Sequence, residues 1–281
     1  MKIGLSLGGG GSRGWAHIGA IHALQEAGVR IDVVNGTSMG AVVGGAYALY
    51  LDTGRLVDCV EQTVKNVNFN YFSMFRFRQE GQSFLRTWLT SAACDVASLR
   101  RYVMSHANNL KALRFVFGHK TFADTRLPFS AVSFDLLAGE TVIIKRGKLV
   151  DGVLPSIAIP GIFPPVCRGA RLLVDGSVLA NVPINELRKQ GAEFIISIEL
   201  AGTDGARPYR NGLDLITYVE ALKQRRLDRW QAQNSDFHFR VNLGTFDSTR
   251  FDNYRVAIER GYEITRRMMP RLLRRLAERG A

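Results

Sequence analysis

Ile31-Asp32-Val33-Val34-Asn35-Gly36-Thr37-Ser38-Met39-Gly40 leads directly into Ala41-Val42-Val43-Gly44-Gly45-Ala46-Tyr47-Ala48. The apolar, β-branched start predicts a buried strand, and the small residues after it predict a helix. Between them lies the pattern G-x-S-x-G. A strand-to-helix turn this tight strains its central residue and leaves no room for side chains at Gly36 and Gly40. In such a turn the Ser38 hydroxyl stands clear of the sheet at the positive end of the helix, so Ser38 is a candidate nucleophile.

Length and composition indicate a globular protein. The chain has 281 residues, 46% of them hydrophobic, and a mean hydropathy near zero. Without an internal repeat, low-complexity tract or Pro/Ser-rich linker, we expect a single domain over residues 1–281. The three cysteines are odd in number and widely spaced, which favours neither a disulfide framework nor a zinc site. The plain interpretation of the cysteines is a reducing compartment. We expect no cofactor and no metal.

The net charge of +12 and the pI near 10 favour contact with either nucleic acid or an anionic membrane surface. No apolar run approaches the roughly 18 residues that a membrane span needs. Glycines and Arg13 interrupt the apolar segment after Lys2, so it does not predict a signal peptide. We expect a cytoplasmic protein that could touch an anionic membrane peripherally.

A glycine-rich loop, residues 8–14, follows a strand expected over residues 2–7 and precedes a helix expected over residues 15–25. Its spacing, Gly-x-Gly-x-x-Gly, matches the dinucleotide-binding fingerprint. That site requires an acidic residue at the end of the second strand, whereas Asp32 lies at its start. Free amides before a helix stabilise an oxyanion as readily as a phosphate. Because the two strands are expected side by side, this loop should face Ser38.

Further strands are expected over residues 127–134, 141–145, 171–174, 194–200 and 237–241, the first two forming a hairpin. Asp175-Gly176-Ser177 follows one of them. An aspartate at the carboxyl end of a strand falls where open α/β sheets place their sites. Asp-Gly is also a common turn, so both interpretations remain open for Asp175.

Two regions allow a membrane interpretation. The first is an aromatic cluster that could form an acyl-chain groove or lid, or equally a helical layer packed on the sheet. It contains Phe69, Tyr71, Phe72, Phe75, Phe77, Phe84 and Trp88. The second is a basic helical region over residues 213–281, whose amphipathic tail should kink at Pro270. The tail could lie on anionic lipid, but packing on the domain with a solvated basic face is favoured.

Three motifs in this order closely resemble the patatin-like phospholipase family: residues 9–14, residues 36–40 and Asp175-Gly176. Supporting phrases are Ala16-His17-Ile18-Gly19, Ile159-Pro160-Gly161-Ile162-Phe163-Pro164-Pro165 and Asn181-Val182-Pro183. The likeness covers residues 1 to about 200 and is greatest to the short bacterial members. It implies a three-layer α/β/α sandwich with a central, mostly parallel sheet. The chain departs from the pattern at Ser177, where members usually carry Gly or Ala.

The resemblance further implies a serine acyl hydrolase of phospholipase A or lysophospholipase type, with phospholipid or lysophospholipid as substrate. Ser38 would attack the ester, Asp175 would accept its proton, and the glycine loop would bind the oxyanion without a metal. Arg13 would steady the loop or a phosphate. The residues so implicated are Ser38 and Asp175 in catalysis, Gly9, Gly10, Gly11, Ser12, Arg13 and Gly14 in the oxyanion loop, Gly36 and Gly40 in the elbow, and Gly176 and Ser177 in the Asp-Gly turn.

Alternatives remain at this stage. His238 follows Asp175, which gives the chain order of Ser-Asp-His triads. Its alternation with Phe237 and Phe239 is equally that of an ordinary strand histidine, which is favoured. A dinucleotide-binding oxidoreductase and a non-catalytic lipid- or nucleic-acid-binding protein are the competing functions. No nucleic-acid recognition motif is present, so that partner is not expected. The sequence contains no signal for oligomeric state, head group or acyl-chain length.

Overall fold

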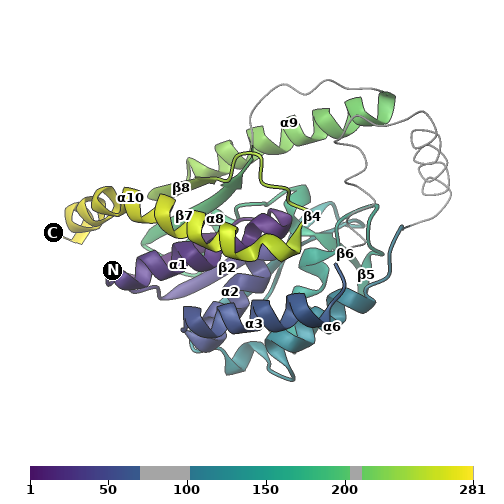
Figure 1. Cartoon of the computed structure of the whole chain (residues 1–281), viewed down its shortest axis with the longest axis horizontal. Coiled ribbons are helices and arrows are strands. Elements are labelled where there is room, and N and C mark those ends of the chain that lie inside the picture. Colours follow the sequence, from purple (N-terminus) through teal and green to yellow (C-terminus); the bar gives the residue numbers. More distant parts are fainter. Residues whose placement is uncertain (70–101, 203–210, 281) are drawn as a thin grey trace.

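A computed structural model describes residues 1–69, 102–202 and 211–280 (Figure 1). These residues form one eight-stranded sheet in the order β5-β6-β3-β2-β1-β7-β8, with β4 paired to β3. The strands are β1 (Ile3–Leu7), β2 (Val33–Thr37), β3 (Phe129–Asp135), β4 (Glu140–Ile144), β5 (Val166–Arg168), β6 (Arg171–Asp175), β7 (Phe194–Ala201) and β8 (Phe237–Asn242).

Helices cover both faces of the sheet. They are α1 (Ala16–Glu26), α2 (Met39–Tyr50), α3 (Thr53–Asn66), α6 (Ala107–Phe117), α7 (Leu149–Val153), α8 (Ile184–Lys189), α9 (Gly212–Ala232) and α10 (Tyr254–Gly280). The five strands β3, β2, β1, β7 and β8 are parallel, and β4, β5 and β6 run antiparallel to their neighbours. The predicted mostly parallel sheet between layers of helices is confirmed.

The two faces of the sheet carry separate apolar clusters, because neighbouring residues of a strand point to opposite sides. Val34 belongs to the large core that includes side chains of α1, α2, α3 and α6. Val33 belongs to a smaller cluster with Ile184 and Leu187 of α8 and Ile195 of β7. The β-branched run that predicted a buried strand is therefore buried on both sides.

Two strands end against the same edge of β3. The first half of that edge pairs with β2 and the second half with β6, while β4 covers the opposite edge. β2 ends with Thr37 opposite Val132. β6 runs in the other direction and ends with Asp175 opposite Ser133. The carboxyl ends of β2 and β6 therefore face each other at adjacent positions of β3.

This arrangement differs from the one on which the prediction for Asp175 rested. That prediction placed Asp175 among the carboxyl ends of parallel strands, but β6 is antiparallel to β3. Asp175 reaches the same place because β3 extends past the end of β2, and β6 pairs only with the extension. The position of Asp175 thus depends on strand register and not on the rule for parallel sheets.

The C-terminal helix α10 packs along α1 (Figure 1), as the sequence favoured. The two backbones cross very closely. A Cβ on Gly19 would lie 1.9 Å from the Ile258 carbonyl oxygen, and one on Gly261 would lie 2.1 Å from that of Ala16. The helix continues through Pro270. Because α10 packs on α1, most of its apolar side is buried within the molecule.

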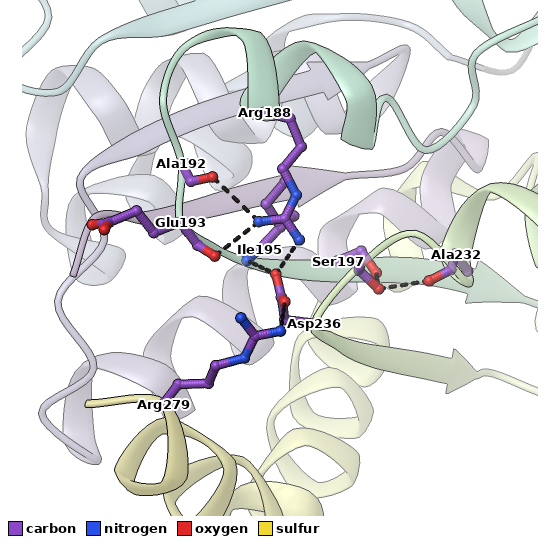
Figure 2. Close-up of polar contacts among 9 residues, drawn as sticks. Arg188, Ala192, Glu193, Ile195, Ser197, Ala232, Asp236 and Arg279 are labelled. Atoms are coloured by element: carbon purple, nitrogen blue, oxygen red, sulfur yellow. Dashed lines mark hydrogen bonds and ion pairs between the residues drawn. The ribbon is translucent and has the colours of Figure 1, made fainter. Parts of the chain in front are cut away.

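The end of α10 is also tied to the sheet through Asp236, shown in Figure 2. This carboxylate accepts hydrogen bonds from Arg188 of α8, from the Ile195 amide of β7 at 2.8 Å and from Arg279 of α10 at 3.1 Å. Arg188 donates in addition to the carbonyl of Glu193 at 2.8 Å. One buried carboxylate therefore connects elements from three parts of the chain.

Most of the predicted aromatic cluster, from Tyr71 to Trp88, lies outside the described residues. Its first member, Phe69, is described and stacks on Phe251 with ring centroids 4.4 Å apart. Phe69 thus contributes to packing beside the large core. None of the helices in the described part of the chain is both long and apolar enough to cross a membrane.

Candidate active site

Ser38 occupies the predicted turn between β2 and α2. Its φ of 55° and ψ of −126° fall in a region that non-glycine residues rarely adopt. The turn closes so tightly that a Cβ on Gly36 would lie 2.2 Å from the Gly40 carbonyl oxygen. A Cβ on Gly40 would lie equally close to the carbonyl oxygen of Leu7. Both positions therefore require glycine, and Ser38 stands at the amino end of α2.

The Asp175 carboxyl group is fully buried beside Ser38. Its Oδ1 accepts a hydrogen bond from the Ser177 amide at 2.9 Å. The Ser38 hydroxyl lies close enough to act as a donor that favours the ionised form of Asp175. The Asp175 Oδ2, however, forms no hydrogen bond of ordinary geometry with a described residue. Burial raises the pKa of Asp175 to about 6, and the donors from Ser177 and Ser38 only partly offset this rise. Asp175 thus carries a buried carboxyl group with an acceptor position that no described donor fills.

Ser177, where the chain departs from the family pattern, contributes to this environment. Its hydroxyl as well as its amide favours the ionised form of Asp175. The neighbouring Gly176 passes close to β3, since a Cβ there would lie 2.5 Å from the Val132 carbonyl oxygen. The Asp-Gly turn therefore packs directly against the backbone of β3.

Ser156 connects the Ser38 turn to β3, and no sequence motif predicted this role. Its hydroxyl accepts from the Ser38 amide at 2.9 Å and donates to the Val132 carbonyl at 2.5 Å. Two residues later, the Ala158 carbonyl accepts from the Asp175 amide at 2.9 Å. This short segment thus contacts the backbone of both Ser38 and Asp175.

The glycine loop lies beside Ser38, since a Cβ on Gly9 would be 3.0 Å from the Ser38 Cβ. Several of its amides already have acceptors. The Gly9 amide donates to the Asn181 side chain at 2.9 Å. The Ser12 amide donates to the Ser248 carbonyl at 2.9 Å, and the Arg13 amide donates to the Gly10 carbonyl at 3.2 Å. The amides of Gly10 and Gly11 donate to none of the described residues. The amides of Gly10 and Gly11 are therefore available as donors to a ligand.

The loop is braced by a segment that the sequence analysis did not single out. The Arg13 guanidinium donates to the Phe246 carbonyl at 3.3 Å, and the Ser12 hydroxyl donates to that of Asp247 at 3.1 Å. Gly11 has a φ of 58° and lies against Ser248, whose carbonyl oxygen would be 2.7 Å from a Cβ. Of the two roles expected for Arg13, these contacts favour steadying the loop.

Two buried polar side chains fix the loop from its other sides. The His17 Nε2 lies 2.7 Å from the Gly8 carbonyl oxygen, and burial lowers the pKa of this histidine to about 4, so a neutral ring donates there. Asn181 accepts from Gly9 and donates to Asp228 of α9 at 2.9 Å. Burial raises the pKa of Asp228 to about 6.

His238 is not part of this arrangement. It lies on β8, which β1 and β7 separate from β2, a distance of about 14 Å at the usual strand spacing. Its ring nitrogens lie 2.8 Å from the Ser197 hydroxyl and 3.0 Å from the Glu199 carboxylate. The structure therefore supports the interpretation of His238 as a strand histidine.

The structure also fails to support a dinucleotide site, which needs an acidic residue at the carboxyl end of β2. Asp32 lies before β2, where it accepts a hydrogen bond from the Ile3 amide at 2.8 Å. The other end of β2 is occupied by the Ser38 turn. The two strands and the loop thus have the connectivity of a nucleotide site without the group that would hold a ribose.

Comparisons with known proteins agree with the motifs. A sequence model of the patatin-like phospholipase family matches residues 5–188. An uncharacterised NTE family protein of Mycobacterium tuberculosis is 34% identical over 216 residues, which cover 77% of this chain and 53% of that protein. The lysophospholipase NTE1 of Meyerozyma guilliermondii is 31% identical over 228 residues, 81% of this chain and 14% of that protein. The chain thus spans about half of the mycobacterial relative and a small part of the yeast one.

The fold has a solved counterpart in VipD from Legionella pneumophila. The two structures superpose with a TM-score of 0.50 and 15% sequence identity, over 96% of this chain and 66% of that one. At this identity the likeness concerns the fold alone.

Proposed function

The chain belongs to the patatin-like phospholipase family, and we propose that it is a serine acyl hydrolase that cleaves lipid esters of the phospholipid or lysophospholipid class. Ser38 is the nucleophile and Asp175 the base. The observation that carries this proposal is the meeting of β2 and β6 along one edge of β3, which sets the Ser38 hydroxyl beside the buried Asp175 carboxyl group.

Acylation begins when the Ser38 oxygen attacks the ester carbonyl carbon while Asp175 takes the hydroxyl proton. The raised pKa of Asp175 makes it a better proton acceptor than an exposed carboxylate, yet leaves it largely ionised at neutral pH. The carbon–oxygen bond to the alcohol then breaks, and Asp175 returns the proton to the departing oxygen. In the second half, water attacks the carbonyl carbon of the acyl-Ser38 ester while Asp175 takes a proton from the water. The bond to the Ser38 oxygen then breaks, and Asp175 returns the proton to that oxygen.

The negative charge that develops on the carbonyl oxygen needs fixed donors. The amides of Gly10 and Gly11 supply them in this scheme, because neighbouring amides already have acceptors. The amino end of α2 adds a favourable field at Ser38. Removal of one donor of this kind typically lowers the rate by about 10²–10³-fold.

The lipid substrate class rests on the family and on the name of the yeast relative, a lysophospholipase. The test is turnover of phosphatidylcholine, lysophosphatidylcholine and p-nitrophenyl butyrate by the wild type and Ser38→Ala, together with labelling by a fluorophosphonate probe. We expect hydrolysis of at least one lipid and a label on Ser38, both lost in Ser38→Ala. A folded wild-type protein that neither reacts with the probe nor cleaves any ester would refute the proposal.

A further inference from the structure

The amphipathic tail was one candidate for membrane contact, but its apolar side is already covered. Ala257, Gly261, Thr265, Met269 and Leu272 of α10 are buried, and α1 packs along this helix. The helix α9 exposes a longer series of apolar side chains than α10 does. In α9, Leu215, Ile216, Val219, Leu222 and Trp230 are between 39% and 61% exposed. An apolar face this open on a surface helix requires an explanation.

These side chains share one face of α9 with cations. At 3.6 residues per turn, the five apolar residues together with Arg226 and Arg229 fall within an arc of about 140°. Both arginines are exposed. Lys223 lies within the same arc and pairs with Glu220 at 2.8 Å. Apolar and basic residues on one face are typical of helices that lie on anionic lipid.

The opposite face of α9 is fixed to the candidate active site. Asp228 is buried and accepts from Asn181, which in turn holds Gly9. The Gln231 side chain donates to the Leu179 carbonyl at 2.5 Å and accepts from the Val182 amide at 3.1 Å. α9 therefore turns its apolar, basic face outwards with its orientation set by the segment that follows Asp175.

The apolar surface continues from α9 toward Asp175. Val178 and Leu179 are 41% and 44% exposed and lie directly after the Asp-Gly turn. Leu179 and Trp230 line one groove of about 290 Å³, together with Leu227. A lipid surface on α9 would thus lie beside the turn that carries Asp175.

We propose that the outward face of α9, extended by Val178 and Leu179, docks on an anionic lipid surface. Aliphatic residues would enter the interface, Trp230 would lie at the headgroup level, and the arginines would attract anionic headgroups. The net charge of +12 favours the same partner. This inference rests on the proposed function, because a lipid substrate is what makes a lipid surface the relevant partner.

The test compares two substitutions that are matched in exposure and chemistry. Leu222 on α9 and Leu273 on α10 are 44% and 43% exposed, and both lie among arginines. Leu222→Glu and Leu273→Glu are prepared in the Ser38→Ala background, so that no vesicle is hydrolysed. Co-sedimentation is measured with vesicles of phosphatidylcholine alone and of equal parts phosphatidylcholine and phosphatidylglycerol.

We expect retention on the phosphatidylglycerol vesicles only. Leu222→Glu should weaken it by about tenfold or more, and Leu273→Glu by less than about threefold. Circular dichroism checks the fold, and Ile216→Glu, at a position 61% exposed, replaces Leu222→Glu if the latter does not fold. Equal effects of the α9 and α10 substitutions, or equal retention on both vesicles, would overturn the proposal.

Two other occupants of this face have distinct signatures. A second copy of the chain predicts a dimer in light scattering that Leu222→Glu dissociates, with no vesicle retention. Nucleic acid predicts salt-sensitive retention of duplex DNA that Leu222→Glu abolishes, again without vesicle retention. Either result refutes lipid docking. Vesicle binding is measured with Ser38→Ala proteins and does not depend on turnover. The result therefore tests lipid docking even if the wild-type protein shows no hydrolase activity.

Discussion

The Gly9 amide donates to the Asn181 side chain at 2.9 Å, and this bond joins the glycine loop to the segment that follows Asp175. The other end of the Asn181 amide donates to Asp228 of α9. One buried side chain thus connects the proposed oxyanion donors, the proposed base and the helix that carries the proposed docking face.

Asn181→Ala should lower kcat for a soluble ester by about 10- to 100-fold while KM changes little, because the loop loses its clamp and small misplacement is costly in catalysis. The Gly9 amide would lose its acceptor and the Asp228 Oδ2 would lose its donor, which should also destabilise the fold by about 1–3 kcal/mol. Steady-state kinetics and urea unfolding measure the two effects. Asn185→Ala, the same change at an exposed asparagine four residues on, should leave both unchanged.

His238→Ala should retain most of the esterase activity, since its ring lies three strands away and is held by Ser197 and Glu199. Asp175→Ala should lose activity by about 10³-fold or more, because it removes the carboxyl group that lies beside Ser38 and takes its proton in the proposed scheme. Turnover of p-nitrophenyl butyrate by both variants distinguishes a dyad from a triad. An equal loss in His238→Ala would transfer the role of base to the histidine.

Activity should rise with pH through about 6, the pKa to which burial raises the Asp175 carboxyl group. Only the ionised form can accept the Ser38 proton, so each pH unit below this value should lower kcat/KM by about tenfold. The measurement is kcat/KM for a soluble ester between about pH 5 and 8. A flat profile across this range would show that the titration of Asp175 does not control the rate.

Asp175→Asn should stabilise the folded protein at neutral pH although it abolishes turnover. The folded-state pKa of Asp175 lies above its ordinary 3.8, so its favourable contribution is complete below about pH 4 and is lost as pH rises through about 6. Above that, the buried carboxylate costs up to about 3 kcal/mol, which asparagine avoids.

Urea unfolding of the wild type and Asp175→Asn at pH 8 and at about pH 4 tests this expectation. The difference in unfolding free energy should favour the variant at the higher pH and nearly vanish at the lower. If Asp175→Asn is less stable than the wild type by a similar amount at both pH values, the Asp175 carboxylate is well solvated or paired in the folded state.

Gly261→Ala should destabilise the protein by more than about 2 kcal/mol, because the new methyl group would lie 2.1 Å from the Ala16 carbonyl oxygen and force α10 away from α1. Gly280→Ala in the same helix meets no atom within 4 Å and should be neutral or slightly stabilising. Thermal unfolding of the two variants checks the contrast. Similar melting temperatures would show that the helix pair adjusts at no cost.

The sequence by itself determined the parts of the site that are built locally. The Ser38 turn was readable because only glycine fits at positions 36 and 40, where the backbone of the turn folds back on itself and on β1. The alternation from apolar strand to small-residue helix located β2 and α2, although β2 begins two residues later than expected and includes Thr37. Short-range sterics and periodicity suffice for features of this kind.

Only the tertiary structure decided which side chains meet. Asp175 faces Ser38 because β2 and β6 end against one edge of β3, a matter of strand register between distant segments. Ser156 and the carbonyls of residues 246–248 carry no local pattern, since any serine or peptide group could serve. Asn181 stood in the phrase Asn181-Val182-Pro183, but nothing in that phrase indicated that its side chain holds Gly9. The side of α9 that stays exposed likewise follows from what the rest of the chain covers. Hydrogen bonds and burial between remote segments are properties of the packed chain, and a linear sequence encodes them only through the fold as a whole.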